Sequence, residues 1–306
     1  MSSLLWLGTA EQVIAEPARG QTSEQSPEVV VQAPEPRFVA PTRRDRIGRI
    51  WAPVMINGKG PFRLVLDTGA SRSGITRHVA ASLGISPDPA TAILLHGVTG
   101  TQTVPFVRVD SFEVGDLVLA PATLLIVTDA LGGAEGVLGT DGLVGMRLSI
   151  DFGHDSIAIG RSRRERAPPG FASIPLEHSP APLLVIRATI GTVRVRAIID
   201  TGGQATIGND AMRAALIRKR AHGTATQVID VTTTSQGGEI FLSPPIELGS
   251  VTVQGARITY GDMRIFEHWH LTNEPAVLIG MDVIGLLEEL VIDYAHHALY
   301  LRTRGG

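Results

Sequence analysis

Two aspartates carry the chemistry that this sequence offers, because Asp67 and Asp200 each begin an Asp-Thr-Gly tripeptide. Two carboxylates held a few ångström apart cannot both ionise cheaply, so the pair keeps one proton over a wide pH range. In that state one carboxylate can accept a proton while the other donates one, and the apparent pKa values belong to the pair. We therefore predict that Asp67 and Asp200 form a catalytic pair, with no fixed acid or base role for either.

The residues after each aspartate are suited to support it. They are Thr68, Gly69 and Ala70 in the first copy, and Thr201, Gly202 and Gly203 in the second. Glycine suits a loop whose backbone must approach a carboxylate closely or adopt a positive φ. The second copy departs from the first by placing Gly203-Gln204 where the first has Ala70-Ser71, which predicts weaker hydrogen bonding around Asp200.

Each tripeptide follows a predicted strand, turn and strand. The apolar runs 51–56 and 61–66 are joined at Asn57-Gly58, a strong short-range signal for a tight β-hairpin. The runs 183–190 and 193–199 repeat this arrangement before Asp200, with charged and apolar residues alternating in the second run. Each aspartate is therefore expected where a buried strand runs into a loop.

A short helix is predicted after each loop, nine residues beyond the aspartate. Thr76 is a suitable N-cap for a helix over 77–83, and Asn209 is suitable for one over 210–217. Gly84 is placed to end the first of these helices.

Further features repeat in the same order. Both copies continue with two strands around a glycine turn, at 112–119 and 246–253. An apolar-apolar-Gly segment follows at 137–139 and 278–280, and a final strand pair at 148–159 and 290–301. Such ordered self-similarity indicates a tandem duplication. We predict a flexible N-terminal extension over 1–44, a first lobe over 45–160, a linker over 161–172 and a second lobe over 173–303.

Each half resembles a retropepsin-like aspartic protease domain, the retroviral type that also occurs in bacterial chains. The motifs that carry this resemblance are Asp-Thr-Gly-Ala-Ser at 67–71, Asp-Thr-Gly-Gly at 200–203, and the segments ending at Gly139 and Gly280. The resemblance implies a mainly β fold of two β-barrel lobes related by pseudo-twofold symmetry, each with a short helix. It also implies an aspartic endopeptidase without cofactor, in which Thr68 and Thr201 brace the loops and Asp67 and Asp200 activate a water.

The resemblance further implies mobile hairpin flaps that close over an extended protein or peptide substrate. We expect them at 94–101 and 228–238, where glycine and small polar residues suit a hinge-like tip. The predicted substrate-binding residues are Gly97, Val98, Thr99, Gly100, Thr233, Thr234 and Ser235. The two segments differ in sequence, so the predicted cleft is asymmetric.

Composition excludes several other classes. The chain has 27 basic and 30 acidic residues, which gives no electrostatic case for nucleic acid. His268 and His270 could share one strand face, but no carboxylate or cysteine at ligand spacing completes a metal site. Asp141 and Asp282 at a helix start, and Asp151 and Asp293 at a strand-end turn, are interpreted as structural residues that cap backbone donors. The apolar start at 4–7 is too short for an integral membrane segment.

Two alternatives remain beside a monomeric, single-chain pseudo-dimer. One is a catalytically inactive pseudoprotease that only binds peptides, and the other is an enzyme whose lobes pair between chains. The leading extension, by resemblance to exported or membrane-tethered family members, favours the bacterial periplasm or cell envelope over the cytoplasm.

Overall fold

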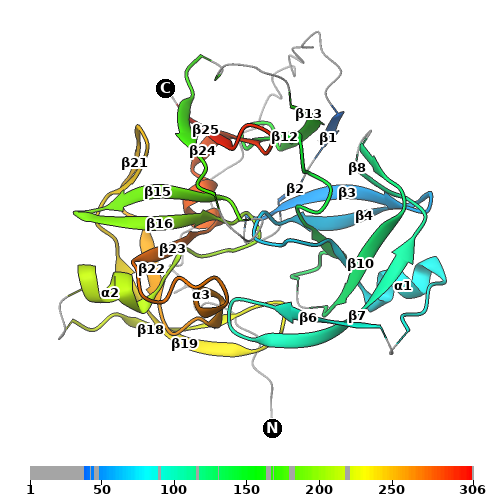
Figure 1. The fold of residues 1–306 in the computed structure, drawn as a ribbon, viewed down its shortest axis with the longest axis horizontal. Helices are drawn as coiled ribbons and strands as arrows, with labels where there is room; N and C mark the ends of the chain where they lie inside the picture. The colour runs from blue at the N-terminus through cyan, green and yellow to red at the C-terminus, as the bar shows by residue number, and fades with distance from the viewer. Residues whose placement is uncertain are drawn as a thin grey trace, which may run out of the picture. The chain divides into compact units, whose positions relative to one another are not determined.

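This computed structural model describes the chain from residue 38 to residue 304, with short gaps. The described ranges are 38–41, 43–44, 48–88, 91–114, 117–129, 131–162, 167, 169–178, 183–217 and 221–304. Most of the predicted extension (1–37) and part of the predicted linker (163–166) lie outside the described residues. The fold is mainly β, as predicted, and the strands form three sheets (Figure 1).

The first sheet is built from the half that contains Asp67. Its strand order is β6-β7-β10-β5-β11-β4-β3-β8-β9, and β2 pairs with β3. The strands are β2 (Arg43–Arg44), β3 (Ile50–Ile56), β4 (Lys59–Leu66), β5 (Gly74–Thr76), β6 (Ala92–His96), β7 (Thr101–Val109), β8 (Phe112–Val114), β9 (Leu117–Leu119), β10 (Ala122–Val127) and β11 (Gly136–Leu138). The predicted hairpin at Asn57-Gly58 is confirmed, since β3 and β4 pair antiparallel and Asn57 and Gly58 both have positive φ.

The second sheet is built from the half that contains Asp200, in the order β18-β19-β22-β17-β23-β16-β15-β20-β21. The strands are β15 (Val185–Ile190), β16 (Val193–Ile199), β17 (Ile207–Gly208), β18 (Thr224–Ile229), β19 (Ser235–Leu242), β20 (Ile246–Leu248), β21 (Val251–Val253), β22 (Arg257–Tyr260) and β23 (Ala276–Ile279). Position by position, this order matches that of the first sheet.

The expected closed barrels are not observed in the described residues. Each sheet is an open ladder, with β6 and β9 at the edges of the first and β18 and β21 at the edges of the second. Closing a barrel needs strands long enough to sustain a consistent stagger around the ring. At one edge of each ladder the strands have only three residues, so the ladder ends in short hairpins.

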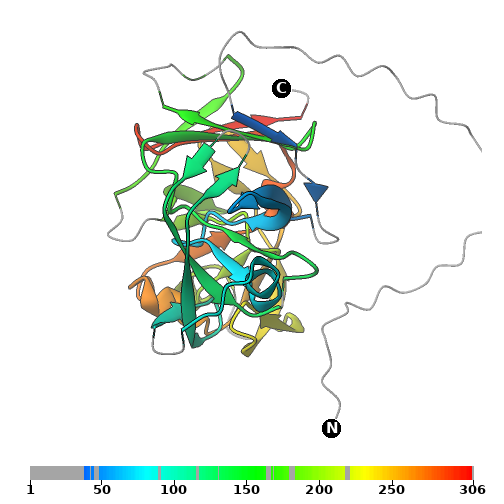
Figure 2. The ribbon, with the colours of Figure 1, turned by 90° about the vertical axis from the view of Figure 1, so that its right-hand side faces the viewer.

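The third sheet contains strands from both halves, in the order β1-β13-β12-β24-β25-β14. Its strands are β1 (Phe38–Pro41), β12 (Met146–Asp151), β13 (Ser156–Arg161), β14 (Ala172–Pro175), β24 (Leu287–Asp293) and β25 (Ala298–Thr303). In Figure 2 blue β1 lies in the upper part of the view with the green and red strands of this sheet, and it pairs antiparallel with β13 at one edge. The central pair, β12 and β24, is antiparallel, with Ser149 opposite Val291. Paired backbone thus includes 38–41 and 43–44 of the predicted extension.

Both predicted N-caps are confirmed. Thr76 Oγ1 accepts the Val79 amide at the start of α1 (Arg77–Leu83), and Asn209 Oδ1 accepts the Met212 amide at 2.9 Å before α2 (Asp210–Leu216). Gly84 ends α1 with a φ of 78°, as its position predicts. Two further short helices are α3 (Arg264–His268) and α4 (Met281–Ile284).

One apolar core runs through both halves and the third sheet. It contains Leu64 and Ile75 from the first half, Ile186 and Ile258 from the second, and Leu148 of the sheet that joins them. Burial of apolar surface is the main favourable term in folding, so this shared core ties the two halves to one another. The strands that precede the aspartates end within it.

Candidate active site

Each aspartate follows a buried strand near the middle of its sheet. In the first half β11 lies between β4 and β5, parallel to β4, and the Asp67 amide donates to the Leu138 carbonyl at 2.9 Å. In the second half β23 lies between β16 and β17 in the same way, and the Asp200 amide donates to the Ile279 carbonyl at 3.0 Å. The backbone of each aspartate is therefore fixed, immediately after the end of its strand, by a hydrogen bond to the neighbouring strand.

Backbone amides of the loops hold one oxygen of each carboxylate. Asp67 Oδ1 accepts from the amides of Gly69 and Ala70 at 2.8 and 3.0 Å. Asp200 Oδ1 accepts from the amides of Gly202 and Gly203 at 2.9 and 3.1 Å. The sequence departure at 203–204 leaves both donors in place, and all four distances lie in the ordinary range, so the expected weakening of hydrogen bonding around Asp200 is not observed in these bonds.

The structure brings the two carboxyl groups together within one chain. The carboxyl group of each aspartate reaches the glycine of the opposite loop. A Cβ added to Gly69 would lie 2.9 Å from Asp200 Cγ, and one added to Gly202 would contact the Asp67 carboxyl group. Glycine at both positions is thus required by the close approach of the opposite carboxyl, because such a Cβ contact is too short to be accommodated.

The threonines of the two loops are bonded reciprocally. Thr68 Oγ1 donates to the Ile199 carbonyl at 2.8 Å and accepts from the Thr201 amide at 3.1 Å. Thr201 Oγ1 donates to the Leu66 carbonyl at 2.8 Å and accepts from the Thr68 amide at 3.1 Å. Both side chains are buried. The four bonds hold the strand ends that carry Asp67 and Asp200 against each other.

The electrostatics of the two carboxyl groups differ. Burial, then the charge of Asp67 and the hydrogen bond with Asp67, raise the pKa of the Asp200 carboxyl well above its usual range. Burial also raises the pKa of Asp67, but the hydrogen bond with Asp200 and the amides of Gly69 and Ala70 act against that rise. Asp200 is buried, whereas Asp67 is partly exposed. The pair is therefore expected to retain a proton at pH values where an ordinary aspartate has lost it.

A second layer of hydrogen bonds supports each loop from behind, and the sequence did not reveal it. Ser73 Oγ donates to Asp141 Oδ1 at 2.6 Å and accepts from the Gly139 amide at 3.0 Å. The second half has the same link, in which Thr206 Oγ1 donates to Asp282 Oδ1 at 2.7 Å. The signal was present, since a hydroxyl residue lies six positions after each catalytic candidate. Asp141 and Asp282 were predicted to cap backbone groups, and each does accept a backbone amide as well as the hydroxyl.

Gly139 and Gly280 allow this layer to pack. A Cβ on Gly139 would lie 2.6 Å from the Arg72 carbonyl carbon, and a Cβ on Gly280 would lie 2.7 Å from that of Ala205. Real Cβ atoms do not approach backbone so closely, which explains why a glycine follows the buried strand in both halves.

Hairpins occupy the two predicted flap segments. The first hairpin, β6–β7, has its turn at 97–100, where the Gly97 amide donates to the Gly100 carbonyl at 2.8 Å. The second, β18–β19, has its turn at 230–234, so Thr233 and Thr234 lie in the turn and Ser235 begins β19. Figure 1 shows the hairpins at the bottom of the view and the third sheet at the top. The two tips contact each other through the Thr99 side chain, whose Oγ1 donates to the Thr234 carbonyl at 2.7 Å.

The histidines considered as metal ligands have another arrangement. His268 ends α3 rather than lying on a strand, and its ring stacks on that of His96 with centroids 3.8 Å apart. The strand expectation was wrong because it followed local alternation, whereas residues 264–268 form a helical turn that buries Ile265 and Phe266. In the described part of the chain, no group of three or more histidine, cysteine, aspartate or glutamate side chains could hold a metal ion.

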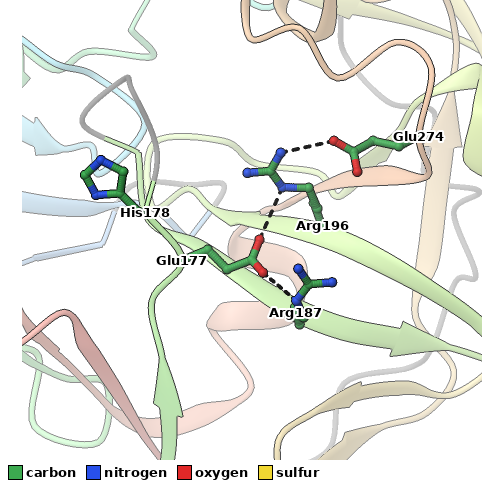
Figure 3. Close-up of a pocket in the computed structure, with 5 residues that line it drawn as sticks. All are labelled: Glu177, His178, Arg187, Arg196 and Glu274. Carbon is green, nitrogen blue, oxygen red and sulfur yellow. Dashed lines mark hydrogen bonds and ion pairs between the residues drawn. The ribbon is translucent and has the colours of Figure 1, made fainter.

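A charged surface pocket lies apart from the aspartates. It is lined by Glu177, His178, Arg187, Arg196 and Glu274 (Figure 3). Glu177 pairs with Arg187 and, at 3.3 Å, with Arg196, which also contacts Glu274 at 3.0 Å. The carboxylates and guanidinium groups compensate one another, so the pocket is a network of ion pairs that contributes no residue to the candidate active site.

Comparison with known proteins supports one half directly. A family model described as aspartyl protease matches residues 52–148, from β3 to β12. The match contains Asp67 and Gly139 and supports an aspartic protease function in general. No curated protein matches the sequence. Among the helices of the described residues, none has the length and apolar character needed to cross a bilayer.

Proposed function

We propose that the chain is a single-chain aspartic endopeptidase in which Asp67 and Asp200 form one catalytic pair. The observation that carries this proposal is the reciprocal bonding of Thr68 and Thr201, which holds the two aspartate loops against each other in one protein chain. The family match over 52–148 supports the same chemistry for the half that contains Asp67.

The proposed reaction begins with one proton on the pair. The ionised carboxylate accepts a proton from a water while the protonated carboxyl donates to the oxygen of the scissile carbonyl, so that attack and polarisation occur together. Burial raises the pKa of both carboxyl groups, so the pair can keep this proton, and neither aspartate is assigned a fixed role as acid or base. When the C–N bond breaks, the carboxyl that took the proton from water donates it to the leaving nitrogen. The other carboxylate takes a proton from a hydroxyl of the tetrahedral intermediate as the carbonyl re-forms, so the pair again holds one proton.

The two halves are proposed to be retropepsin-like lobes related by a pseudo-twofold axis, over 45–160 and 173–303. The matching strand orders and the equivalent bonds behind each loop support this. The substrate is proposed to be an extended protein segment bound beneath the hairpins by strand-like hydrogen bonds. The tip residues Gly97 to Gly100 and Thr233 to Ser235 would then contact it.

The decisive experiment is cleavage of a diverse peptide library by the full chain across acidic to neutral pH. Asp67→Asn and Asp200→Asn should each lower cleavage by at least about 10²-fold, because each removes one half of the acid–base pair. The control is Asp110→Asn, an exposed carboxylate in a turn of the first half, which should retain wild-type cleavage. A wild-type chain that binds peptides without cleaving them would instead establish the peptide-binding alternative.

Mixing the two variants tests whether the halves pair within a chain. If Asp67 of one chain acted with Asp200 of another, a mixture of Asp67→Asn and Asp200→Asn would regain a fraction of the wild-type rate. We expect no recovery, with a monomer in size-exclusion chromatography. Recovered cleavage would contradict the single-chain arrangement and leave the dyad chemistry intact.

A further inference from the structure

The two hairpin tips differ in charge. The turn at 97–100 has no ionisable side chain, whereas the turn at 230–234 begins with Asp230. This carboxylate does not belong to the proposed catalytic pair, and it lies where the tips of the two hairpins meet.

Asp230 uses its two oxygens for different partners. Oδ1 accepts from the amide of Thr232 at 2.8 Å and from the Thr232 hydroxyl, which organises its own turn. Oδ2 accepts from the Thr99 amide at 2.8 Å, across to the other hairpin. Thr99 and Thr232 are both buried, so these bonds are shielded from water. Hydrogen bonds to an ionised acceptor are about twice as strong as neutral ones, and shielding strengthens them further.

Glycine lets the tips approach this closely. A Cβ on Gly97 would overlap the Asp230 carboxyl group, with its Cγ at 2.8 Å, and a Cβ on Gly100 would lie 2.7 Å from Thr234 Oγ1. Neither glycine has the positive φ that would by itself favour glycine. The contact between the tips is therefore what excludes a side chain at these two positions.

Each tip also contacts the opposite half. The Val98 carbonyl accepts from the Ile265 amide of α3 at 3.2 Å, and Val98 packs against the apolar cluster of the second half. The Val231 carbonyl accepts from Thr128 Oγ1 at 2.7 Å, and Val231 packs against a cluster of the first half. The hairpins thus cross over, each held by the other half.

We propose that the Asp230 carboxylate holds the two tips together and thereby positions the backbone of residues 97–100 for the substrate. The inference rests on the proposed function for its catalytic consequence, but the link between the tips is a property of the fold. Asp230 acts through the Thr99 amide, so it is a positioning residue rather than a catalytic one.

Two variants separate the link from the turn. In Asp230→Asn one oxygen is replaced by an NH₂ group, so an asparagine cannot accept from both Thr99 and Thr232 as the carboxylate does. Thr232→Val removes the hydroxyl within the turn and leaves the bond to Thr99 in place. Asp262→Asn, an exposed carboxylate before α3, is the control for loss of charge in this region.

The first readout is amide hydrogen exchange of residues 97–100, which needs no catalysis. We expect exchange at Thr99 to rise about 10- to 100-fold in Asp230→Asn, as suits the loss of one bond to a charged group. Thr232→Val and Asp262→Asn should change it less than about threefold. If the exchange rate of the Thr99 amide is unchanged in Asp230→Asn, the inference is overturned. It is also overturned if Thr232→Val raises that exchange rate as much as Asp230→Asn does.

The second readout is peptide cleavage. If Asp230 positions the tip in the transition state, Asp230→Asn lowers kcat and kcat/KM together by about tenfold, with KM little changed. A rise in KM alone would show that the link only assists binding and would overturn the positioning role. If the wild-type chain cleaves nothing while exchange at Thr99 responds as expected, the proposed function fails and the link between the tips stands.

Discussion

Replacing Thr68 by alanine tests whether the two aspartate loops depend on each other. The change removes the bond from the Thr68 hydroxyl to the Ile199 carbonyl and the bond to that hydroxyl from the Thr201 amide. Both partners belong to the opposite loop. Thr68 is 1% exposed, so water cannot readily replace the lost hydroxyl.

The expected cost follows from the two partners left behind. A buried polar group without a partner costs about 1–3 kcal/mol, so the two groups left by Thr68→Ala should lower the free energy of unfolding by about 2–6 kcal/mol. Thr68→Ser keeps the hydroxyl and loses one buried methyl group, which costs about 1 kcal/mol. The serine variant is therefore the matched control.

Urea denaturation followed by tryptophan fluorescence measures the difference. We expect Thr68→Ala to unfold at clearly lower urea than Thr68→Ser, with an unchanged slope. Thr201→Ala and Thr201→Ser should behave in the same way, because the bonds are reciprocal. If the alanine and serine variants unfold at the same urea concentration, the reciprocal bonds do not hold the halves together and the reasoning is refuted.

Three further predictions concern stability. Asp200→Asn should raise the thermal midpoint of unfolding at pH 7 while cleavage is lost. The reason is that the pKa of the buried Asp200 carboxyl is raised, so its ionisation at pH 7 costs stability that an asparagine does not lose. The gain should vanish near pH 3, where this carboxyl is protonated in the unfolded chain as well. Asp293→Asn should show the opposite pH dependence. Burial acts to raise the pKa of the Asp293 carboxyl, but hydrogen bonds from Ser162 and His296 outweigh it and lower the pKa. The ionised carboxyl therefore stabilises the fold above about pH 4, so the variant should lose stability there and the loss should shrink as pH falls. Gly280→Ala should cost more than about 2 kcal/mol in urea denaturation because its Cβ meets backbone, whereas Gly160→Ala, with open space around it, should cost less than about 1 kcal/mol.

Local signals predicted the elements around the site well. Thr76 and Asn209 cap helices where the sequence placed them, and Asn57-Gly58 forms the predicted hairpin turn. These features are determined by neighbouring residues, through a side-chain oxygen that accepts a nearby amide or a backbone that accepts positive φ. The mainly β class follows from the same kind of local alternation.

Other long-range features were not predicted from the sequence. The pairing of β12 with β24 depends on which of many apolar strands meet in the folded chain. The contact between Asp230 and Thr99 likewise joins residues 131 positions apart. The short helix at His268 was missed because five residues carry too little periodicity to separate a helical turn from a strand.

The register of β12 against β24 has a consequence for how such a chain could arise. Ser149 and Val291 hold the same place in the two proposed copies, and they lie opposite each other. A strand that pairs antiparallel with its own counterpart at the same position is self-complementary, so two separate chains with one copy each could build the same sheet as a symmetric dimer. Joining the copies replaces an assembly that depends on protein concentration with one at fixed, high effective concentration. Joining also lets the two copies differ in sequence. The contact between the hairpin tips needs such a difference, because Asp230 lies at one tip and Gly97 and Gly100 lie at the other.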